Sequence, residues 1–125
     1  MKKVKVIYWF STVLVSLLGA APAAMYYTSP FFIDGFRHLG FPDYFRYELA
    51  TGKLIGLVLL LLPQVPARIK EWTYAGFGIV FISAIIAHGT IDANARTIGG
   101  IAALLLLIVS YIYYHRVNDV KKALA

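Results

Sequence analysis

The chain has 125 residues, which is room for one domain, 1–125. Hydrophobic residues make up 60% and charged residues 14%, where soluble domains average about 45–50% and about 25%. A soluble protein this small is mostly surface and would leave apolar area in water, and a disordered chain would be far more polar. Both classes are excluded, so we expect an integral membrane protein whose main surroundings are the lipid bilayer.

The charge balance and the absence of cysteine limit which partners and cofactors the protein can have. Twelve Lys and Arg against six Asp and Glu give a net charge of +6. Most of the basic residues flank apolar segments, where membrane insertion and anionic lipid account for them, so we expect no nucleic-acid partner. The absence of cysteine excludes disulfides, thiolate nucleophiles and iron–sulfur clusters within the chain. A redox role would therefore need a cofactor without Cys ligands or a redox partner protein.

Four segments are long and apolar enough to cross a bilayer, which takes about 20 residues. They cover about 7–27, 44–62, 71–91 and 98–114, and they predict an all-α bundle of four transmembrane helices. With the N-terminus inside, basic residues gather strongly on the cytoplasmic side, so both termini should be cytoplasmic. That side holds Lys2, Lys3, Lys5, Arg68, Lys70, Arg116, Lys121 and Lys122, against Arg37, Arg46 and Arg96 on the other.

The first segment also has the features of a signal peptide, with a basic start and an A-x-A sequence at 21–23. Aromatic residues at both of its ends, Tyr8 and Tyr26 among them, favour a retained span. Pro22 should loosen its last turns. The connection 28–43 is long and rich in Phe, and we expect it to lie in the interface as a short helix or a re-entrant segment.

Lys53 is the most informative polar residue, because it falls near the middle of the second span. A charge there costs at least about 2.5–3.5 kcal/mol, so such residues usually face a bundle interior or a wet cavity. Glu48 is the nearest acid, but five positions along a helix place it about 140° away. A ligand anion or another helix is then the expected partner. The alternative is a helix that starts near Ala50 and lets Lys53 extend outward to water.

His88 and Asp92 are four residues apart at the outer end of the third span and would share a helix face. They could form a proton-handling or ligand site, or Asp92 could simply pair with Arg96. Two ligands are too few for a metal, so we expect no metal site. His88 and His115 lie near opposite faces, which argues against a haem. No catalytic motif is present, and we expect no independent catalytic activity.

Small residues recur at a spacing that lets helices approach closely. Gly52 and Gly56 flank Lys53, and Gly99 precedes Ala103 by four. This spacing predicts tight helix packing, and it does not separate contacts within one chain from a homo-oligomer.

Four short motifs in order resemble the DoxX-like family of small bacterial four-helix membrane proteins. They are GFPDYF at 40–45, LATGKLIG at 49–56, LLP at 61–63 and RIKEWTYAGF at 68–77, followed by an isolated His88. The resemblance implies a four-helix membrane bundle and makes Lys53, Glu71 and His88 a polar signature. Some relatives are associated with membrane oxidoreductase systems, including thiosulfate:quinone oxidoreductase.

The resemblance and the composition lead to one functional expectation with two alternatives. We expect a multi-pass protein of the bacterial inner membrane that is an accessory or anchor subunit of a redox-linked system. It would carry no cofactor of its own and could bind a quinone-like lipophilic molecule. The alternatives are a small transporter or permeability factor and a structural scaffold for partner proteins. A cavity that reaches Lys53 would favour ligand binding, a water path through the bundle would favour transport, and a dry bundle would favour a scaffold.

Overall fold

The computed structural model describes residues 2–91 and 95–124, and it leaves the side chains of 91–96 undescribed. Every regular element in the described residues is helical, which confirms the all-α prediction. The elements in chain order are α1 (Lys2–Val15), η1 (Ser16–Ala20), η2 (Ala21–Met25), α2 (Pro30–His38), α3 (Asp43–Leu61), α4 (Ala67–Ile91) and α5 (Ala95–Leu124).

The first long helix changes its winding towards its end. After α1 the chain makes a π-helical turn, η1, in which the N–H of Ala21 donates to the carbonyl of Ser16. A 3-10 helix, η2, follows and contains Pro22. Proline has no N–H and cannot donate to the carbonyl four residues back, so it interrupts the regular hydrogen bonding of an α-helix. The loosening expected at Pro22 is thus present as two turns that are not α-helical.

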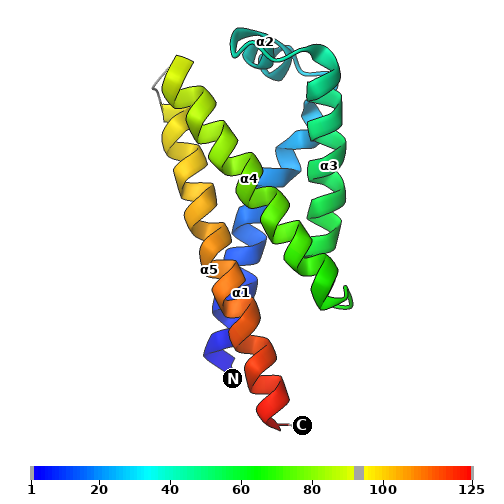
Figure 1. The fold of residues 1–125 in the computed structure, drawn as a ribbon, viewed down its shortest axis with the longest axis vertical. Coiled ribbons are helices and arrows are strands. Elements are labelled where there is room, and N and C mark those ends of the chain that lie inside the picture. Colours follow the sequence, from blue (N-terminus) through cyan, green and yellow to red (C-terminus); the bar gives the residue numbers. More distant parts are fainter. Residues whose placement is uncertain (1, 92–94, 125) are drawn as a thin grey trace.

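Helix α5 packs against both α1 and α4 and forms the larger core with them (Figure 1). One buried serine links the three helices. The hydroxyl of Ser110 on α5 lies 2.6 Å from that of Thr12 on α1 and 2.7 Å from that of Tyr74 on α4. Hydrogen bonds of this kind help to hold helices together in lipid, where apolar surfaces alone give little preference for one another.

Helix α3 packs against η2 and α4, and α2 lies across the end where α3 begins (Figure 1). Ala23 of η2 and Ala50 of α3 are both fully buried, and with Tyr26 they form a second, smaller core. At the other end of α3, the buried amine of Lys70 donates to the carbonyl of Leu60 at 2.7 Å. A carbonyl in the last turn of a helix has no partner within that helix, so Lys70 satisfies a group that α3 cannot satisfy itself.

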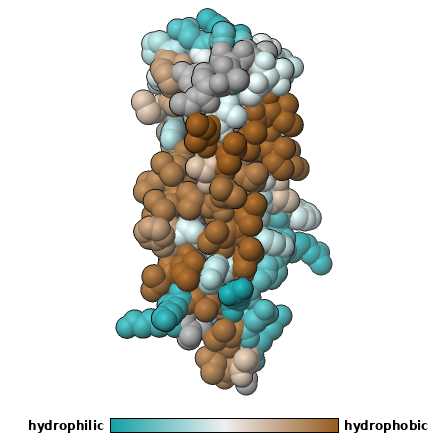
Figure 2. Space-filling view, turned by 90° about the vertical axis from the view of Figure 1, so that its left-hand side faces the viewer, coloured by the Kyte–Doolittle hydropathy of each residue, from teal (hydrophilic) through white to brown (hydrophobic). Residues whose placement is uncertain are grey.

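The surface has an apolar band between two polar ends (Figure 2). Within the residues that the structure describes, three helices are long and apolar enough to cross a membrane: Lys2–Met25, Ala67–Thr90 and Thr97–Leu124. Helix α3 is not one of the three, because Arg46, Glu48 and Lys53 interrupt its apolar sequence. Both termini and the connection from α3 to α4 lie towards one end of the molecule, and α2 lies at the other (Figure 1).

Several helix ends differ from the limits of the apolar segments. Helix α5 runs to Leu124 rather than stopping near residue 114, and α4 begins at Ala67, directly after a proline, rather than at 71. In both cases polar residues extend the helix beyond its apolar stretch, since hydropathy marks only the part of a helix that lies in lipid. The connection 28–43 contains the short helix α2, one of the two forms expected for it.

Candidate functional site

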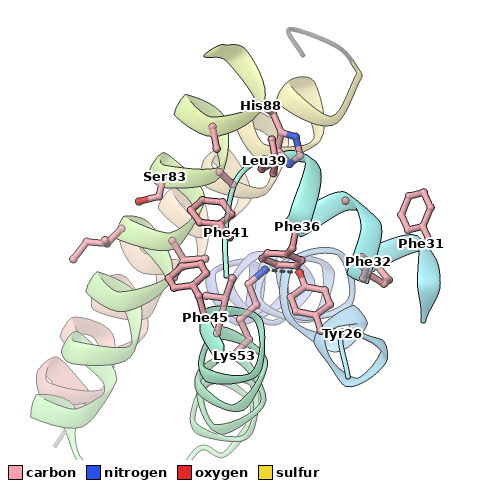
Figure 3. A pocket seen from close by; sticks show the side chains of 16 residues that line it. Tyr26, Phe31, Phe32, Phe36, Leu39, Phe41, Phe45, Lys53, Ser83 and His88 are labelled. Atoms are coloured by element: carbon pink, nitrogen blue, oxygen red, sulfur yellow. Dashed lines mark hydrogen bonds between the residues drawn. The ribbon is translucent and has the colours of Figure 1, made fainter. Parts of the chain in front are cut away.

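A cavity of about 360 Å³ lies between α2, α3 and α4, and we call it the α2 cavity. Its volume is within the usual range for sites that bind small molecules. Helix α2 and the chain after it supply several phenylalanines, while α4 supplies small side chains such as Ser83 and Ala84 (Figure 3). The aromatic lining residues are Tyr26, Phe31, Phe32, Phe36, Phe41 and Phe45. The cavity is therefore mainly apolar, with flat rings on several sides.

Lys53 brings an amine to this cavity. Its Nζ donates a hydrogen bond of 2.9 Å to the hydroxyl of Tyr26 and lies 5.1 Å from the centre of the same ring (Figure 3). The ring of Tyr26 is itself held by Phe32 and Phe36, at centroid distances of 4.7 and 5.1 Å. An ammonium group gains from both a hydroxyl oxygen and an aromatic face when water is scarce. The partner of Lys53 in the structure is thus a tyrosine, 27 residues earlier in the sequence.

Arg46 fixes the backbone of the same tyrosine. Its side chain is only 2% exposed, and its Nε donates to the carbonyl of Tyr26 at 2.7 Å. One of its terminal nitrogens lies 3.0 Å from a carboxylate oxygen of Asp43. Tyr26 is therefore held at the carbonyl by Arg46 and at the hydroxyl by Lys53. Along α3, Arg46 precedes Ala50 and Lys53 follows it.

Asp43 also joins α2 to α3. Arg37, in the last turn of α2, makes two hydrogen bonds to the Asp43 carboxylate, at 3.0 and 3.2 Å. The guanidinium of Arg37, and after it that of Arg46, hold the pKa of the Asp43 carboxyl below its usual value. This two-arginine cluster attaches the helix that covers the cavity to the helix that carries Lys53.

The predicted polar residues are distributed unevenly around the cavity. His88 lines it at the end away from Lys53, so the two residues share one cavity (Figure 3). Asp92 lies outside the described residues. Glu48 is exposed and lines a second space, the α3–α4 groove, of about 410 Å³. Lys53 lines this groove as well, so Glu48 and Lys53 share the groove although they lie on different faces of α3.

The four predicted packing residues have different surroundings. A Cβ added to Gly56 would lie 2.6 Å from the ring of Phe77, so α3 and α4 approach closely there. Ala103 is buried in the larger core. A Cβ on Gly52 or Gly99 would meet nothing within 4 Å among the described residues, so neither glycine closely approaches another of them.

The third residue of the polar signature, Glu71, lies at the start of α4, far along the helix from His88. Its carboxylate is 2.6 Å from Nε2 of His115 on α5. Among the residues that the structure describes, no three His, Cys, Asp or Glu side chains come close enough together to hold a metal ion.

Sequence reasoning missed Tyr26 and Arg46 as parts of the site. The sequence places Tyr26 in an interfacial belt and counts Arg46 only among the basic residues of the outer side. A signal existed for Arg46, which is on the same helix as Lys53 and seven residues before it, two turns away on the same face. Nothing in the sequence pairs Tyr26 with Lys53, because their contact depends on how η2 packs on α3.

Residues 10–111 match the DoxX-like family, which confirms the resemblance seen in the motifs. No curated protein and no solved structure matches the chain. The family match and the three long apolar helices together show a multi-pass membrane protein.

Proposed function

This chain belongs to the DoxX-like family, and we propose that it is a four-span protein of the bacterial inner membrane that binds a lipophilic molecule with a small polar head. The binding site is the α2 cavity. One observation carries the proposal: the amine of Lys53, on an otherwise apolar part of α3, lies beside Tyr26 in a cavity walled by aromatic rings.

The chemistry of Lys53 favours a ligand with an oxygen acceptor. An ammonium group has three N–H donors and no acceptor, and Tyr26 accounts for one of the donors. Placing such a group within a membrane helix is costly, so intramembrane lysines usually mark a ligand or ion site. A carbonyl or carboxylate oxygen of a ligand would accept the remaining donors, while the phenylalanine rings would enclose its apolar part.

A quinone-like molecule fits these requirements. Its flat ring can lie against the phenylalanines, and its carbonyl oxygen can accept a hydrogen bond from Lys53. The protein would then be the membrane anchor or accessory subunit of a redox-linked system and would hold the molecule for a redox partner protein. Beyond Lys53 the described lining of the α3–α4 groove carries no charged side chain, which favours binding over transport along a polar path.

The four-span arrangement rests on the position of α3. The chain returns along α3 from the end that holds α2 to the end that holds both termini (Figure 1). The charges that lower its hydropathy are paired in part: Arg46 with Asp43 and the Tyr26 carbonyl, and Lys53 with the Tyr26 hydroxyl. The basic residues near both termini would then be cytoplasmic. Reporter fusions after Ala125 and within 28–43 test this orientation, and an extracytoplasmic signal from the C-terminal fusion would refute it.

Binding is tested by native mass spectrometry of the protein extracted in mild detergent, in the parent and in Lys53→Met. This change keeps the length of the side chain and removes the charge and the donors. We expect the parent to retain a small lipophilic molecule and Lys53→Met to insert and fold but to lose it. Lys5→Met, which removes an exposed lysine far from the cavity, is the matched control and should retain it. Equal retention by Lys53→Met would refute the proposed site.

A further inference from the structure

The α2 cavity and the α3–α4 groove adjoin at Lys53. Four residues line both spaces: Phe45, Leu49, Lys53 and Val80. The two spaces therefore adjoin, and the lysine lies at their junction. A molecule held at Lys53 has room on both sides of the amine, not only among the phenylalanines.

The two spaces differ in their chemistry. The α2 cavity carries the polar groups of Lys53, Tyr26 and His88. From Lys53 towards the α3–α4 connection, the lining of the groove contains no charged side chain, and its one hydroxyl, on Thr73, donates to a carbonyl of its own helix. Trp72, at this end of the groove, is 71% exposed. Lys53, Tyr26 and His88 thus favour an oxygen-bearing head group on the cavity side of the amine, and the uncharged part of the groove accepts a hydrocarbon chain.

Two glycines leave the groove open. A Cβ on Gly52 of α3 or on Gly76 of α4 would meet nothing within 4 Å, and both residues line the groove. Gly56 differs, because the ring of Phe77 already occupies the space beside it. Side chains at positions 52 and 76 can therefore extend into the groove without displacing the helices.

We infer that the ligand is an amphipathic lipid whose oxygen-bearing head lies at Lys53 in the α2 cavity and whose hydrocarbon tail lies in the α3–α4 groove. This inference rests on the proposed function and names its ligand class. The occupant follows from the shared wall of the two spaces at Lys53 and from the uncharged lining of the groove on one side of the lysine. The head needs only an oxygen acceptor, so a tailed quinone and a fatty carboxylate share the required chemistry.

The test uses the full chain in nanodiscs of phosphatidylethanolamine and phosphatidylglycerol, with photoreactive probes. A decyl benzoquinone and a decyl carboxylate are each made with the photoreactive group at the head or at the tail end, and labelled residues are mapped by mass spectrometry. Gly52→Leu and Gly76→Leu fill the groove from its two walls. Gly99→Leu is the matched control, since Gly99 is equally open but lies on α5, outside both spaces.

We expect head probes to label the α2 cavity and tail probes to label groove residues such as Leu59 and Trp72, in both cases saturably. Each groove variant should weaken labelling by the tail probe about tenfold, or about 1.4 kcal/mol, because added methylenes take the space of the tail. Gly99→Leu should match the parent. Labelling by only one of the two chemistries identifies the head as a quinone or a carboxylate.

Two results would overturn the inference in distinguishable ways. If head probes label the cavity saturably but tail labelling is spread over the lipid-facing helices or is unchanged in the groove variants, the tail lies elsewhere and the proposed function stands. If no probe labels either space saturably, the proposed function fails, and the inference fails with it.

Discussion

The side chain of Arg46 donates to the backbone carbonyl of Tyr26, whose hydroxyl accepts a hydrogen bond from Lys53. Two cations of α3 thus hold one tyrosine at its two ends. Since the cationic groups lie on the same helix and Tyr26 on another segment, these bonds also fasten η2 to α3. The position of the Lys53 amine therefore depends on Arg46, although Arg46 bonds the carbonyl of Tyr26 and Lys53 bonds its hydroxyl.

Arg46→Met should destabilise the protein by about 1.5–3 kcal/mol, the range for a hydrogen bond made by a charged group. The loss leaves the Tyr26 carbonyl without its partner in a buried position. Thermal unfolding in detergent, followed by circular dichroism, measures the change. Arg37→Gln is the control, because Arg37 pairs with the same carboxylate at an exposed position where ion pairs contribute little. Similar losses for both variants would show that Arg46 acts only through Asp43.

The carboxyl of Asp43 should make stability depend on pH in the acid range. Its pKa is lowered in the folded state, first by Arg37 and then by Arg46. A lowered pKa means that the unfolded chain binds the proton more readily, so the contribution is complete above the unfolded value of about 3.9. It is lost as the pH falls through the lower folded value. Unfolding temperatures measured from neutral pH into this range should fall less steeply for Asp43→Asn. Parallel curves for parent and variant would contradict the prediction.

Substitution by alanine should lower the stability of the protein at Gly56 and raise it at Gly52. In Gly56→Ala the new Cβ would lie 2.6 Å from the buried ring of Phe77, and forcing it in should cost about 1–3 kcal/mol. In Gly52→Ala the Cβ meets nothing, so the better helix propensity of alanine should stabilise α3 by up to about 1 kcal/mol. Unfolding of both variants in mixed micelles checks the contrast. Equal tolerance at the two positions would show that α3 and α4 are not in contact at Phe77.

The hydroxyl cluster of Thr12 and Ser110 should give a measurable coupling energy between α1 and α5. A double-mutant cycle of Thr12→Val and Ser110→Ala should yield about 0.6–1.7 kcal/mol, as hydrogen bonds between membrane helices do. Tyr74→Phe offers a second cycle with the same serine, on α4. A coupling energy of zero in both cycles would mean that neither hydroxyl pair contributes to stability.

Hydropathy and charge predicted most of the fold, because a long apolar segment in a membrane has few alternatives to a spanning helix. They also singled out Lys53, since a lone charge in an apolar segment is conspicuous. They could not choose between Gly52 and Gly56, because two residues four apart share a helix face, while only packing decides which of them meets a large side chain. Here Phe77 of α4 meets Gly56 alone.

The walls of the cavity were less predictable than its lysine. The sequence predicts that the phenylalanines of 28–43 lie in the membrane interface. This prediction gives their general surroundings but not the residues that they contact. That Phe36 and Phe41 face α3 and α4 across a cavity follows from the placement of α2, whose Phe32 and Phe36 pack on Tyr26 and whose Arg37 pairs with Asp43. Such pairs join residues on separate elements, and no periodic pattern marks them.

The change of winding in the first helix determines where the side chain of Tyr26 points. Ala23 and Tyr26 are both buried and lie three residues apart. In a 3-10 helix, with three residues per turn, residues at this spacing lie on one line along the helix. Had the winding been α-helical between Ala23 and Tyr26, at 3.6 residues per turn, Tyr26 would be rotated away from that line by about 60°. The tyrosine would then lie off the face that η2 presents to α3, and Lys53 would lose its hydroxyl partner. Pro22 thus affects the binding site without lining it, because it cannot make the α-helical hydrogen bond to the carbonyl four residues back and lies where the winding changes.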